Sequence, residues 1–549
     1  MLLKPLVILS VLCSYGLAAP EIQIGATTVV GKDLTESNTE FFGGIPFAEP
    51  PVGALRFRDP VLKMTPGVAT FNATEFGKSC LQPTMFGPPM DISEDCLTIN
   101  IVRPAGTKPQ EKLPILLWVY GGAFVSGGSN LYDGSTLVAR GVERGTPIVY
   151  VNFNYRVGAF GYPQGKEADN RGALNLGLKD IVAALKWVHA NADAFGGDAT
   201  KITIFGESAG AMNIGHLMLS PGFDTLVRAA ILQSGSPSSV SATRAVERSA
   251  VWEAFVGSIP SCARVAKSGR TFRCLQEASE EEIMTSYLGL PGLDFLGGLS
   301  WVPTLDFRRG SLFPGVPSQL YKSGKFARIP FIAGTNMDEG TLFAMAFRSP
   351  EANEDLLRAS TLATISPAKN PGRRLTNAVD RMLRLYPDVP ALGSPYNTGD
   401  ELFGFPSIYK RAAAIQGDLV FDAPRRQLSQ AAAQKKVKSY GYLFTQPQPA
   451  DPANGVAHAA EIPWVYGTPP DQSPSAQGFS TSLMDYWISF TVSLDPNDGK
   501  GSERPVWPEY TKRAPNLLQL DSENTTVIRD DFREERISFH HDNAIHLGK

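Results

Sequence analysis

The segment ITIFGESAGAMN, residues 202–213, places one serine where its hydroxyl could act as a nucleophile. A β-branched and aromatic run ends at Gly206, and apolar residues at helical spacing follow Gly210, so Ser208 stands at a predicted strand-to-helix turn. Bulky residues two positions from the serine would clash at such a turn, which favours glycine on both sides. The turn also sets the hydroxyl near a helix N-terminus, where developing negative charge is favoured. Ser208 is therefore the predicted nucleophile, and it still needs a base.

Histidine is the residue type best suited to take the serine proton near neutral pH. His189 lies within a predicted helix, and His216 follows Ser208 by two turns and points away from it. Three more histidines crowd a tail that we expect to be exposed, and no carboxylate or cysteine spacing there supports a metal site. His458 stands in NGVAHAAEIPW, where small neighbours let an imidazole reach out of a loop, so it is the predicted base. The tail histidines are His540, His541 and His546.

A third side chain should orient the histidine and stabilise its charged form. The segment IAGTNMDEGTLF offers Asp338 and Glu339 just after a predicted strand. Either carboxylate could instead cap a helix N-terminus, and the residues alone do not choose between them. The chain order serine, acid, histidine is the order that an α/β-hydrolase sheet requires.

Developing negative charge on a substrate oxygen needs backbone N–H groups aimed at it. The segment VYGGAFVSGG, residues 119–128, follows a predicted strand upstream of Ser208. Its glycines let the backbone approach a substrate closely. The predicted donors are the N–H groups of Gly122, Ala123 and Ala209.

Short apolar strands that alternate with helices must position these groups. This alternation predicts a mostly parallel sheet with helices on both faces, and no stretch resembles a linker between independent domains. We expect one catalytic domain over residues 19–549. The predicted strands cover 113–122, 147–155, 202–205, 229–235, 330–335 and 439–444, and the clearest predicted helix lies within 173–197.

The N-terminus and the composition indicate an exported protein. Residues 1–18 carry one lysine, an apolar run and small residues, which is the pattern of a secretory signal peptide cut after Ala18; a buried N-terminal strand is the alternative. No later stretch is apolar enough to span a bilayer. The formal net charge of −3 and the pI of about 6.2 give no reason to expect nucleic acid or an anionic membrane as a partner.

Cysteine usage agrees with export. Four cysteines remain after the signal peptide, and loop-closure entropy favours the local pairs Cys80–Cys96 and Cys262–Cys274. Zinc binding is the rival interpretation, but no CxxC spacing or nearby histidine supports it. The sequons at Asn72 and Asn524 are candidate glycosylation sites.

Taken together, the segments resemble the type-B carboxylesterase/lipase family, which includes cholinesterases and the fungal lipases of the Candida rugosa and Geotrichum type. The resemblance runs in the family's order from about residue 40 to residue 512. It is carried by FFGGIPFAEPPVGALRFRDP, SEDCLTINI, WVYGGAF, NYRVGAFGY, FGGDATKITIFGESAGA, ILQSGSP, GTNMDEGT, GVAHAAEIPWVYG, LDPNDG and WPEYT.

The resemblance implies an α/β-hydrolase fold and a secreted serine hydrolase that cleaves carboxylic esters through an acyl-enzyme, without a cofactor. By position it implies Ser208 as nucleophile, Glu339 as acid and His458 as base. It places Gly122, Ala123 and Ala209 at the oxyanion positions, Ser234 beside the acid, the two disulfides as paired above, and Arg56 with Glu94 as a buried ion pair.

Two departures from the family pattern bear on the substrate. Ala123 stands where many fungal relatives have glycine, but its N–H remains available. The loop between Cys80 and Cys96, a long lid in Candida-type lipases, is short here, has few apolar residues and contains three prolines. This favours an esterase with an open gorge over a strict interfacial lipase; contact with a lipid surface stays open. The alternatives are a non-catalytic adhesion module of the cholinesterase type and a serine peptidase.

Overall fold

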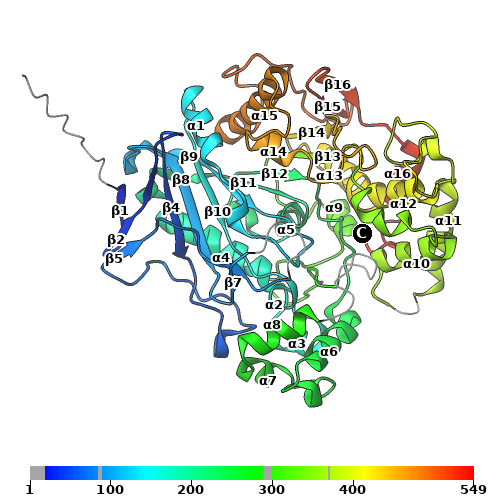
Figure 1. The fold of residues 1–549 in the computed structure, drawn as a ribbon, viewed down its shortest axis with the longest axis horizontal. Coiled ribbons are helices and arrows are strands. Elements are labelled where there is room, and N and C mark those ends of the chain that lie inside the picture. Colours follow the sequence, from blue (N-terminus) through cyan, green and yellow to red (C-terminus); the bar gives the residue numbers. More distant parts are fainter. Residues whose placement is uncertain (1–18, 84–89, 290–299, 369–370) are drawn as a thin grey trace, which may run out of the picture.

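A large mixed sheet forms the centre of the computed structural model, which describes residues 19–83, 90–289, 300–368 and 371–549. Its eleven strands run in the order β16-β15-β14-β13-β12-β11-β9-β10-β8-β4-β3 (Figure 1). In chain order they are β3 Lys32–Leu34, β4 Thr39–Pro46, β8 Thr98–Pro104, β9 Leu113–Val119, β10 Val149–Phe153, β11 Gly197–Glu207, β12 Ala229–Gln233, β13 Phe331–Asn336, β14 Ser439–Phe444, β15 Asn516–Leu520 and β16 Thr526–Arg529.

The middle of the sheet is parallel, and both edges are antiparallel. Strands β10, β9, β11, β12, β13, β14 and β15 pair in parallel, whereas β8, β4 and β3 at one edge and β16 at the other pair antiparallel. All residues of β10 and β12 are buried, so both sheet faces are covered, as their continuous apolar sequences predict. The six predicted strands are confirmed as β9 to β14.

The N-terminal strands were not predicted from the sequence. Strands β1 Glu21–Ile24, β2 Thr27–Val30 and β5 Thr70–Asn72 form a separate three-stranded sheet. Each has only three or four residues, too few for a clear alternation of apolar and polar side chains.

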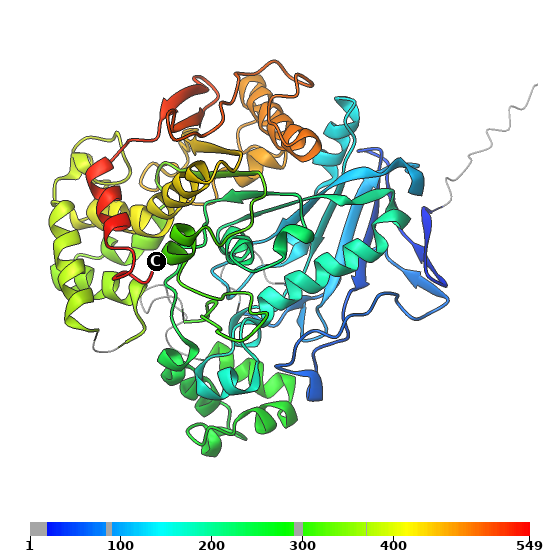
Figure 2. The ribbon, with the colours of Figure 1, turned by 180° about the vertical axis from the view of Figure 1, so that it is seen from behind.

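Helices pack against the strands of the central sheet. The predicted helix is confirmed as α4, Leu176–Asn191, which crosses the molecule in the foreground of Figure 2. Helix α5, Ala209–Met218, packs on β11 and β12, and α13, Ala423–Gln434, packs on β13 and β14. In Figure 1 a group of helices that includes α10, Glu354–Ile365, and α12, Ile408–Gly417, lies to the right of α5.

The expectation of an exposed C-terminal tail is wrong. Residues Glu534–Asp542 form helix α16, and His540 is buried against Tyr386, whose hydroxyl lies 3.1 Å from His540 Nε2. His541 Nε2 lies 2.8 Å from the carbonyl oxygen of Ala423. Only His546 of the three is exposed. The segment is rich in polar residues, which predicts exposure, but these polar groups form hydrogen bonds inside the fold and can therefore be buried.

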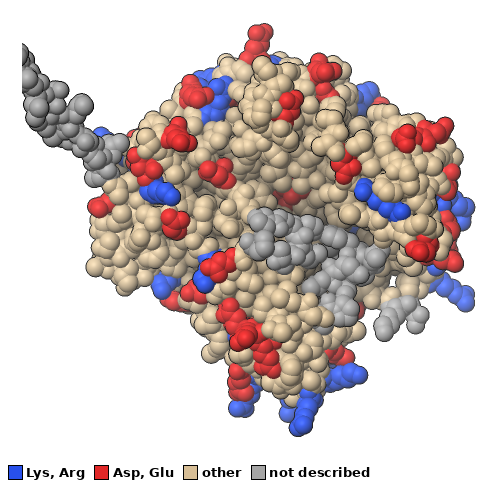
Figure 3. Space-filling view, in the orientation of Figure 1, with Lys and Arg blue, Asp and Glu red and all other residues tan. Residues whose placement is uncertain are grey.

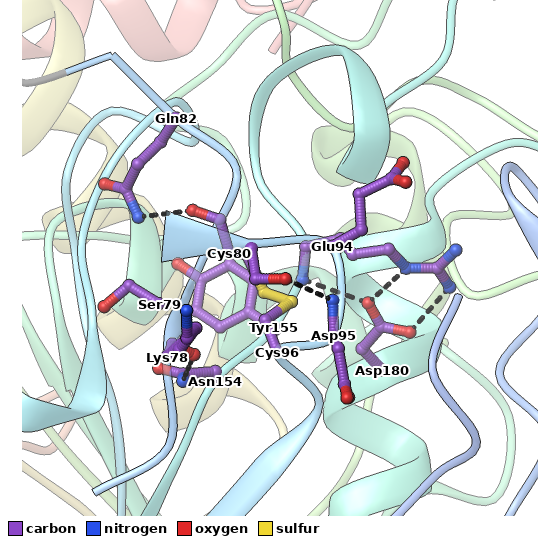
Figure 4. The surroundings of a disulfide bond; sticks show 12 residues. Lys78, Ser79, Cys80, Gln82, Glu94, Asp95, Cys96, Asn154, Tyr155 and Asp180 are labelled. Atoms are coloured by element: carbon purple, nitrogen blue, oxygen red, sulfur yellow. Dashed lines mark hydrogen bonds and ion pairs between the residues drawn. A yellow bond between two sulfur atoms is a disulfide. The ribbon is translucent and has the colours of Figure 1, made fainter. Parts of the chain in front are cut away.

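Two disulfides join the cysteine pairs that loop-closure entropy favours. The S–S distance is 2.03 Å for Cys80–Cys96 and 1.94 Å for Cys262–Cys274. Figure 4 shows the first of them, next to which Gln82 donates to the Cys80 carbonyl at 3.0 Å. Residues 84–89, the middle of the predicted lid loop 80–96, lie outside the described residues, as does the predicted signal peptide 1–18.

The surface shows no strong charge separation on the face in Figure 3, where acidic and basic side chains are interspersed. None of the described helices is both long enough and apolar enough to cross a membrane.

Candidate active site

Ser208 occupies the sharp turn between β11 and α5. Its φ of 53° and ψ of −127° are strained for a residue with a side chain. A Cβ atom at Gly210 would lie 2.0 Å from the carbonyl oxygen of Val119, and one at Gly206 would lie 2.6 Å from the same oxygen. Both positions therefore require glycine because neighbouring strand β9 passes directly beneath the turn.

Glu339 and His458 form the shortest polar contact of the site. Glu339 lies just beyond the end of β13, and its Oε2 is 2.5 Å from His458 Nδ1. The other carboxylate oxygen accepts hydrogen bonds from the Ser234 hydroxyl at 2.6 Å and from the Asn336 N–H at 2.8 Å. The carboxylate is thus fixed on both oxygens, and it orients the imidazole.

Asp338, the alternative acid in the sequence, faces elsewhere. Its carboxylate accepts hydrogen bonds from the Ser394 hydroxyl at 2.8 Å and from the N–H groups of Tyr396 at 2.8 Å and Val456 at 2.9 Å. It therefore ties together two loops and leaves the histidine to Glu339.

The second ring nitrogen of His458 points to the serine turn. His458 Nε2 lies 3.0 Å from Oε1 of Glu207, the residue before Ser208. No described residue forms a hydrogen bond with this nitrogen, so the structure has no Ser208–His458 hydrogen bond. Hydrogen bonds between nucleophile and base are often long or absent before substrate binds. The rings of Phe421 and Phe343, whose centroids lie 4.6 and 5.2 Å from that of His458, hold the imidazole there.

Three buried carboxylates surround this histidine. Burial raises the pKa of Glu207 to about 8. Burial alone would lower the pKa of His458, but Glu207 and Glu339 outweigh it and raise that pKa to about 9. Glu461 also has a pKa raised by burial, and it accepts hydrogen bonds from Gln233 at 3.1 Å and Asn336 at 2.7 Å.

Glu207 and Glu461 were not predicted from the sequence as part of the site. Their positions in the sequence could have indicated both residues. Glu207 directly precedes the serine, and Glu461 follows His458 by three residues in HAAE.

The backbone N–H groups of the three predicted oxyanion donors, Gly122, Ala123 and Ala209, have no acceptor among the described residues. Ala209 is the first residue of α5, whose initial N–H groups have no partner in the helix. Gly122 has a φ of +109°, and a Cβ there would lie 2.2 Å from the Ser126 carbonyl oxygen, which explains the glycine.

A small cavity opens beside Ser208. It has a volume of about 60 Å³ and is lined by Ser208, Ala123 and Ala209 together with residues from several helices. Phe124 and Phe343 line it as well, whereas Phe347 is part of the hydrophobic core.

The remaining histidines serve the fold. His216 is buried against the ring of Phe313 at 4.3 Å, and burial lowers its pKa to about 3. His189 Nε2 lies 2.9 Å from the Leu226 carbonyl oxygen. Among the described residues, no cluster of three or more histidine, cysteine or acidic side chains could hold a metal ion.

The sheet order, the serine turn after β11 and the acid after β13 define an α/β-hydrolase fold. Comparison with protein families gives the same class: residues 18–540 match the model of the carboxylesterase family. The chain belongs to this family and is a carboxylic-ester hydrolase.

The most similar known proteins include fungal lipases and an esterase. Lipase 1 of Geotrichum candidum is 34% identical, with 95% of each chain covered. The secreted triacylglycerol lipase LIP1 of Gibberella zeae is 33% identical, with 94% of this chain and 89% of the relative covered. The crystal structure of Aspergillus niger EstA superimposes with a TM-score of 0.82 at 27% identity, over 97% of this chain and 99% of that one.

Proposed function

We propose that this protein is a secreted serine esterase that forms an acyl-enzyme on Ser208. Its substrates are carboxylic esters such as acylglycerols, sterol esters, or aryl and alkyl esters. The observation that carries the proposal is the 2.5 Å contact between Glu339 and His458, with the other imidazole nitrogen at the serine turn, 3.0 Å from Oε1 of Glu207 next to Ser208. A non-catalytic module would have no need of this arrangement.

In the proposed reaction, His458 Nε2 removes the Ser208 proton as the hydroxyl oxygen attacks the ester carbonyl. The N–H groups of Gly122, Ala123 and Ala209 stabilise the resulting oxyanion. His458 then protonates the departing alcohol, and water, activated by the same histidine, releases the acid. Glu339 stays ionised and stabilises the imidazolium, while Ser234 holds Glu339 in place.

Glu207 must be protonated for this reaction. An ionised Glu207 beside Nε2 would hold a proton on the imidazole and prevent it from acting as a base. Burial raises the pKa of Glu207 to about 8, which keeps its carboxyl group neutral near pH 7. A neutral Glu207 also no longer raises the pKa of His458.

Ser208→Ala tests the proposal directly. We expect kcat to fall by about 10⁶, because removal of a nucleophile leaves only binding and the oxyanion donors. An organophosphorus probe should label Ser208 in the wild type and leave the variant unlabelled. The control is Ser475→Ala, an exposed serine in α15, Pro474–Ser493, which should keep full activity. Near-normal ester turnover by Ser208→Ala would refute the proposed nucleophile.

We further propose that residues 1–18 are removed on export and that residues 19–549 form one catalytic domain. The two disulfides and the name of the Gibberella zeae relative, a secreted triacylglycerol lipase, support export. The side chains of Asn72 and Asn524 are exposed and accessible to glycosylation.

N-terminal sequencing of protein secreted by a fungal host tests the export proposal. We expect Ala19 as the first residue, and endoglycosidase treatment should lower the mass unless both Asn72→Gln and Asn524→Gln are introduced. Retention of Met1 on secreted protein would contradict the cleavage.

A further inference from the structure

A second and larger cavity lies apart from the cavity at Ser208. It is an open groove with a volume of about 810 Å³, and the two cavities share no described lining residue. One wall is helix α4, in the foreground of Figure 2. The other walls are the residues around the 3₁₀ turn η1, Gly53–Leu55, the turn between α3, Gly165–Arg171, and α4, and the segment 306–312. A ligand in this groove would therefore not contact the catalytic residues.

Basic side chains predominate in the lining of the groove. Six arginine and lysine side chains line it, against the two carboxylates of Asp59 and Asp306. The described lining thus has an excess of positive charge, although the whole chain has a formal net charge of −3. Such a local excess attracts anions. The six basic residues are Arg58, Arg171, Lys179, Lys186, Arg308 and Arg309.

Three of the six cations are already paired within the fold. Lys179 Nζ lies 2.6 Å from Asp59 Oδ1. Arg308 donates to both carboxylate oxygens of Asp306, each at 2.8 Å. Arg171 lies 2.9 Å from an acidic side chain one helical turn earlier. These pairs hold the walls of the groove in place.

The other three cations, Arg58, Lys186 and Arg309, are available to a ligand. Their side chains are exposed, and within the described ranges none of them takes part in a hydrogen bond, an ion pair or a ring contact. A guanidinium can bind a carboxylate through two parallel hydrogen bonds. An anion can thus bind here without breaking an existing ion pair.

The cations are spread along the groove. Lys179 and Lys186 are seven residues apart on α4, and Val182 and Ala183 between them also line the groove. This spacing belongs to one helix face, and a rise of 1.5 Å per residue separates the two lysine backbones by about 10 Å. One small anion would use only part of the groove, so the arrangement suits a chain that carries several anionic groups.

The carboxylates in the lining favour a ligand that carries hydroxyl groups as well. The side chain of Asp59 is 68% exposed, and its Oδ2 accepts no hydrogen bond from the described residues. A sugar hydroxyl can donate to this oxygen. A polyphosphate has no such donor at neutral pH, and the carboxylates would repel it.

The lining is poorly suited to nucleic acid. Proteins that bind single strands stack the bases on aromatic side chains. The described lining has one aromatic residue, Phe57, which is buried, and its ring stacks on Phe160 with a centroid distance of 5.6 Å. No aromatic face in the described lining is therefore open to a base.

We propose that this groove binds an acidic polysaccharide made of uronic acid units. Arg58, Lys186 and Arg309 bind the sugar carboxylates, and Asp59 accepts hydrogen bonds from sugar hydroxyls. Binding there retains the protein on an anionic polysaccharide matrix. The inference does not depend on the proposed function, because no catalytic residue lines the groove.

Titration calorimetry of the wild-type protein with an oligogalacturonate at pH 7 and low ionic strength tests the proposal. A neutral galactose oligomer of the same length is the control ligand. We expect the acidic oligomer to bind at least about 10-fold more tightly, because several charge pairs are lost with the neutral one. Added salt should weaken the binding, since exposed charges are screened.

A triple variant, Arg58→Gln with Lys186→Gln and Arg309→Gln, assigns the binding to the groove. An exposed charge pair contributes up to about fivefold in affinity, so the loss of three should raise Kd for the oligogalacturonate by at least about 10-fold. All three side chains are exposed, so the fold should be retained.

The matched control is a second triple variant, Lys267→Gln with Lys512→Gln and Arg513→Gln. These side chains are also exposed, they lie outside the groove lining, and their loss changes the net charge of the protein equally. We expect Kd to change by less than about twofold, because charges at distant sites are screened.

Three outcomes would overturn the proposal. They are no saturable binding of the oligogalacturonate to the wild type, equal weakening in the two triple variants, and tighter binding of a polyphosphate or a single-stranded oligonucleotide of equal charge. Hydrolysis of ethyl acetate is measured on the same samples and should be equal in all of them. Binding without any hydrolysis by the wild type would refute the esterase proposal and leave the groove inference standing.

Discussion

His458 lies between two carboxylates that have different tasks. Glu339 holds Nδ1 and must be ionised, whereas Glu207 lies 3.0 Å from Nε2 and must be neutral for the imidazole to accept a proton there. The same burial that raises the pKa of Glu207 therefore serves catalysis. Because Glu207 and His458 interact, the pH dependence of the rate reports on both of them.

Glu207→Gln tests this coupling. Glu207 is neutral below its pKa of about 8, so the substitution should leave the acid limb of the kcat/KM profile in place. It should abolish the fall in rate on the alkaline side, where an ionised Glu207 holds a proton on His458. The profile of Glu281→Gln, at a glutamate in the first turn of surface helix α8, Glu280–Leu288, should match the wild type. An alkaline limb that Glu207→Gln leaves unchanged would show that Glu207 does not control the protonation of His458.

At the scale of elements, the serine turn depends on how closely α5 and β9 approach each other. The two glycines beside Ser208 leave space that no side chain could share with the Val119 carbonyl oxygen. The left-handed backbone at Ser208 is held by its N–H, which donates to the Gln233 carbonyl at 2.9 Å, and by its own carbonyl, which accepts from Met212 at 2.8 Å.

Gly210→Ala tests this packing. The added Cβ would lie 2.0 Å from the Val119 oxygen, so the helix must move, at a cost of about 1–3 kcal/mol in the free energy of unfolding and with loss of activity. Gly478→Ala in α15 is the matched control. Nothing lies within 4 Å of the added atom there, and the change should stabilise the protein by about 0.5–1 kcal/mol. Equal effects of the two substitutions in denaturant titrations would contradict the packing argument.

At the scale of the whole molecule, the disulfides and buried ion pairs fix loops that the sheet does not reach. Cys80–Cys96 lies next to the Arg56–Glu94 pair, in which Nε and Nη2 of the arginine lie 2.5 and 2.6 Å from the two carboxylate oxygens. Arg56 also donates to the carbonyl oxygen of Ala278 at 2.7 Å, which links this region to the helices around Cys262–Cys274.

Removal of the second disulfide tests its contribution. The double substitution of Cys262 and Cys274 by serine opens a loop with a sequence separation of 12 residues, so we expect the free energy of unfolding to fall by about 3 kcal/mol. Denaturant titration measures the loss, and peptide mapping without reductant identifies the bridge. An unchanged unfolding midpoint, or a peptide that joins Cys262 to Cys80 or Cys96, would contradict the pairing.

Local sequence patterns were sufficient to predict the middle strands of the central sheet and the turn at Ser208. Strands β9 to β14 are continuous apolar runs, and GESAG sits between a strand and a helix, so short-range periodicity and steric demands determine both. The same reasoning failed for α16. Its many charged residues predict exposure, yet Arg533, directly before the helix, contacts Asp418 at 2.8 Å and Asp422 at 2.7 Å within the fold.

The amino-acid sequence by itself determined which residue types could cleave an ester, and it placed the serine, the acid and the histidine in the order that the fold requires. Residue types and spacing left open which carboxylate meets the imidazole, the family resemblance implied Glu339, and the tertiary structure supplies the physical reason. Asp338 and Glu339 are adjacent and chemically alike, and what separates them is that loops near residues 395 and 456 bind Asp338 while His458, 119 residues away from Glu339, arrives on the other side. The same holds for the contact between Glu207 and His458, because contacts between distant segments depend on the path of the whole chain.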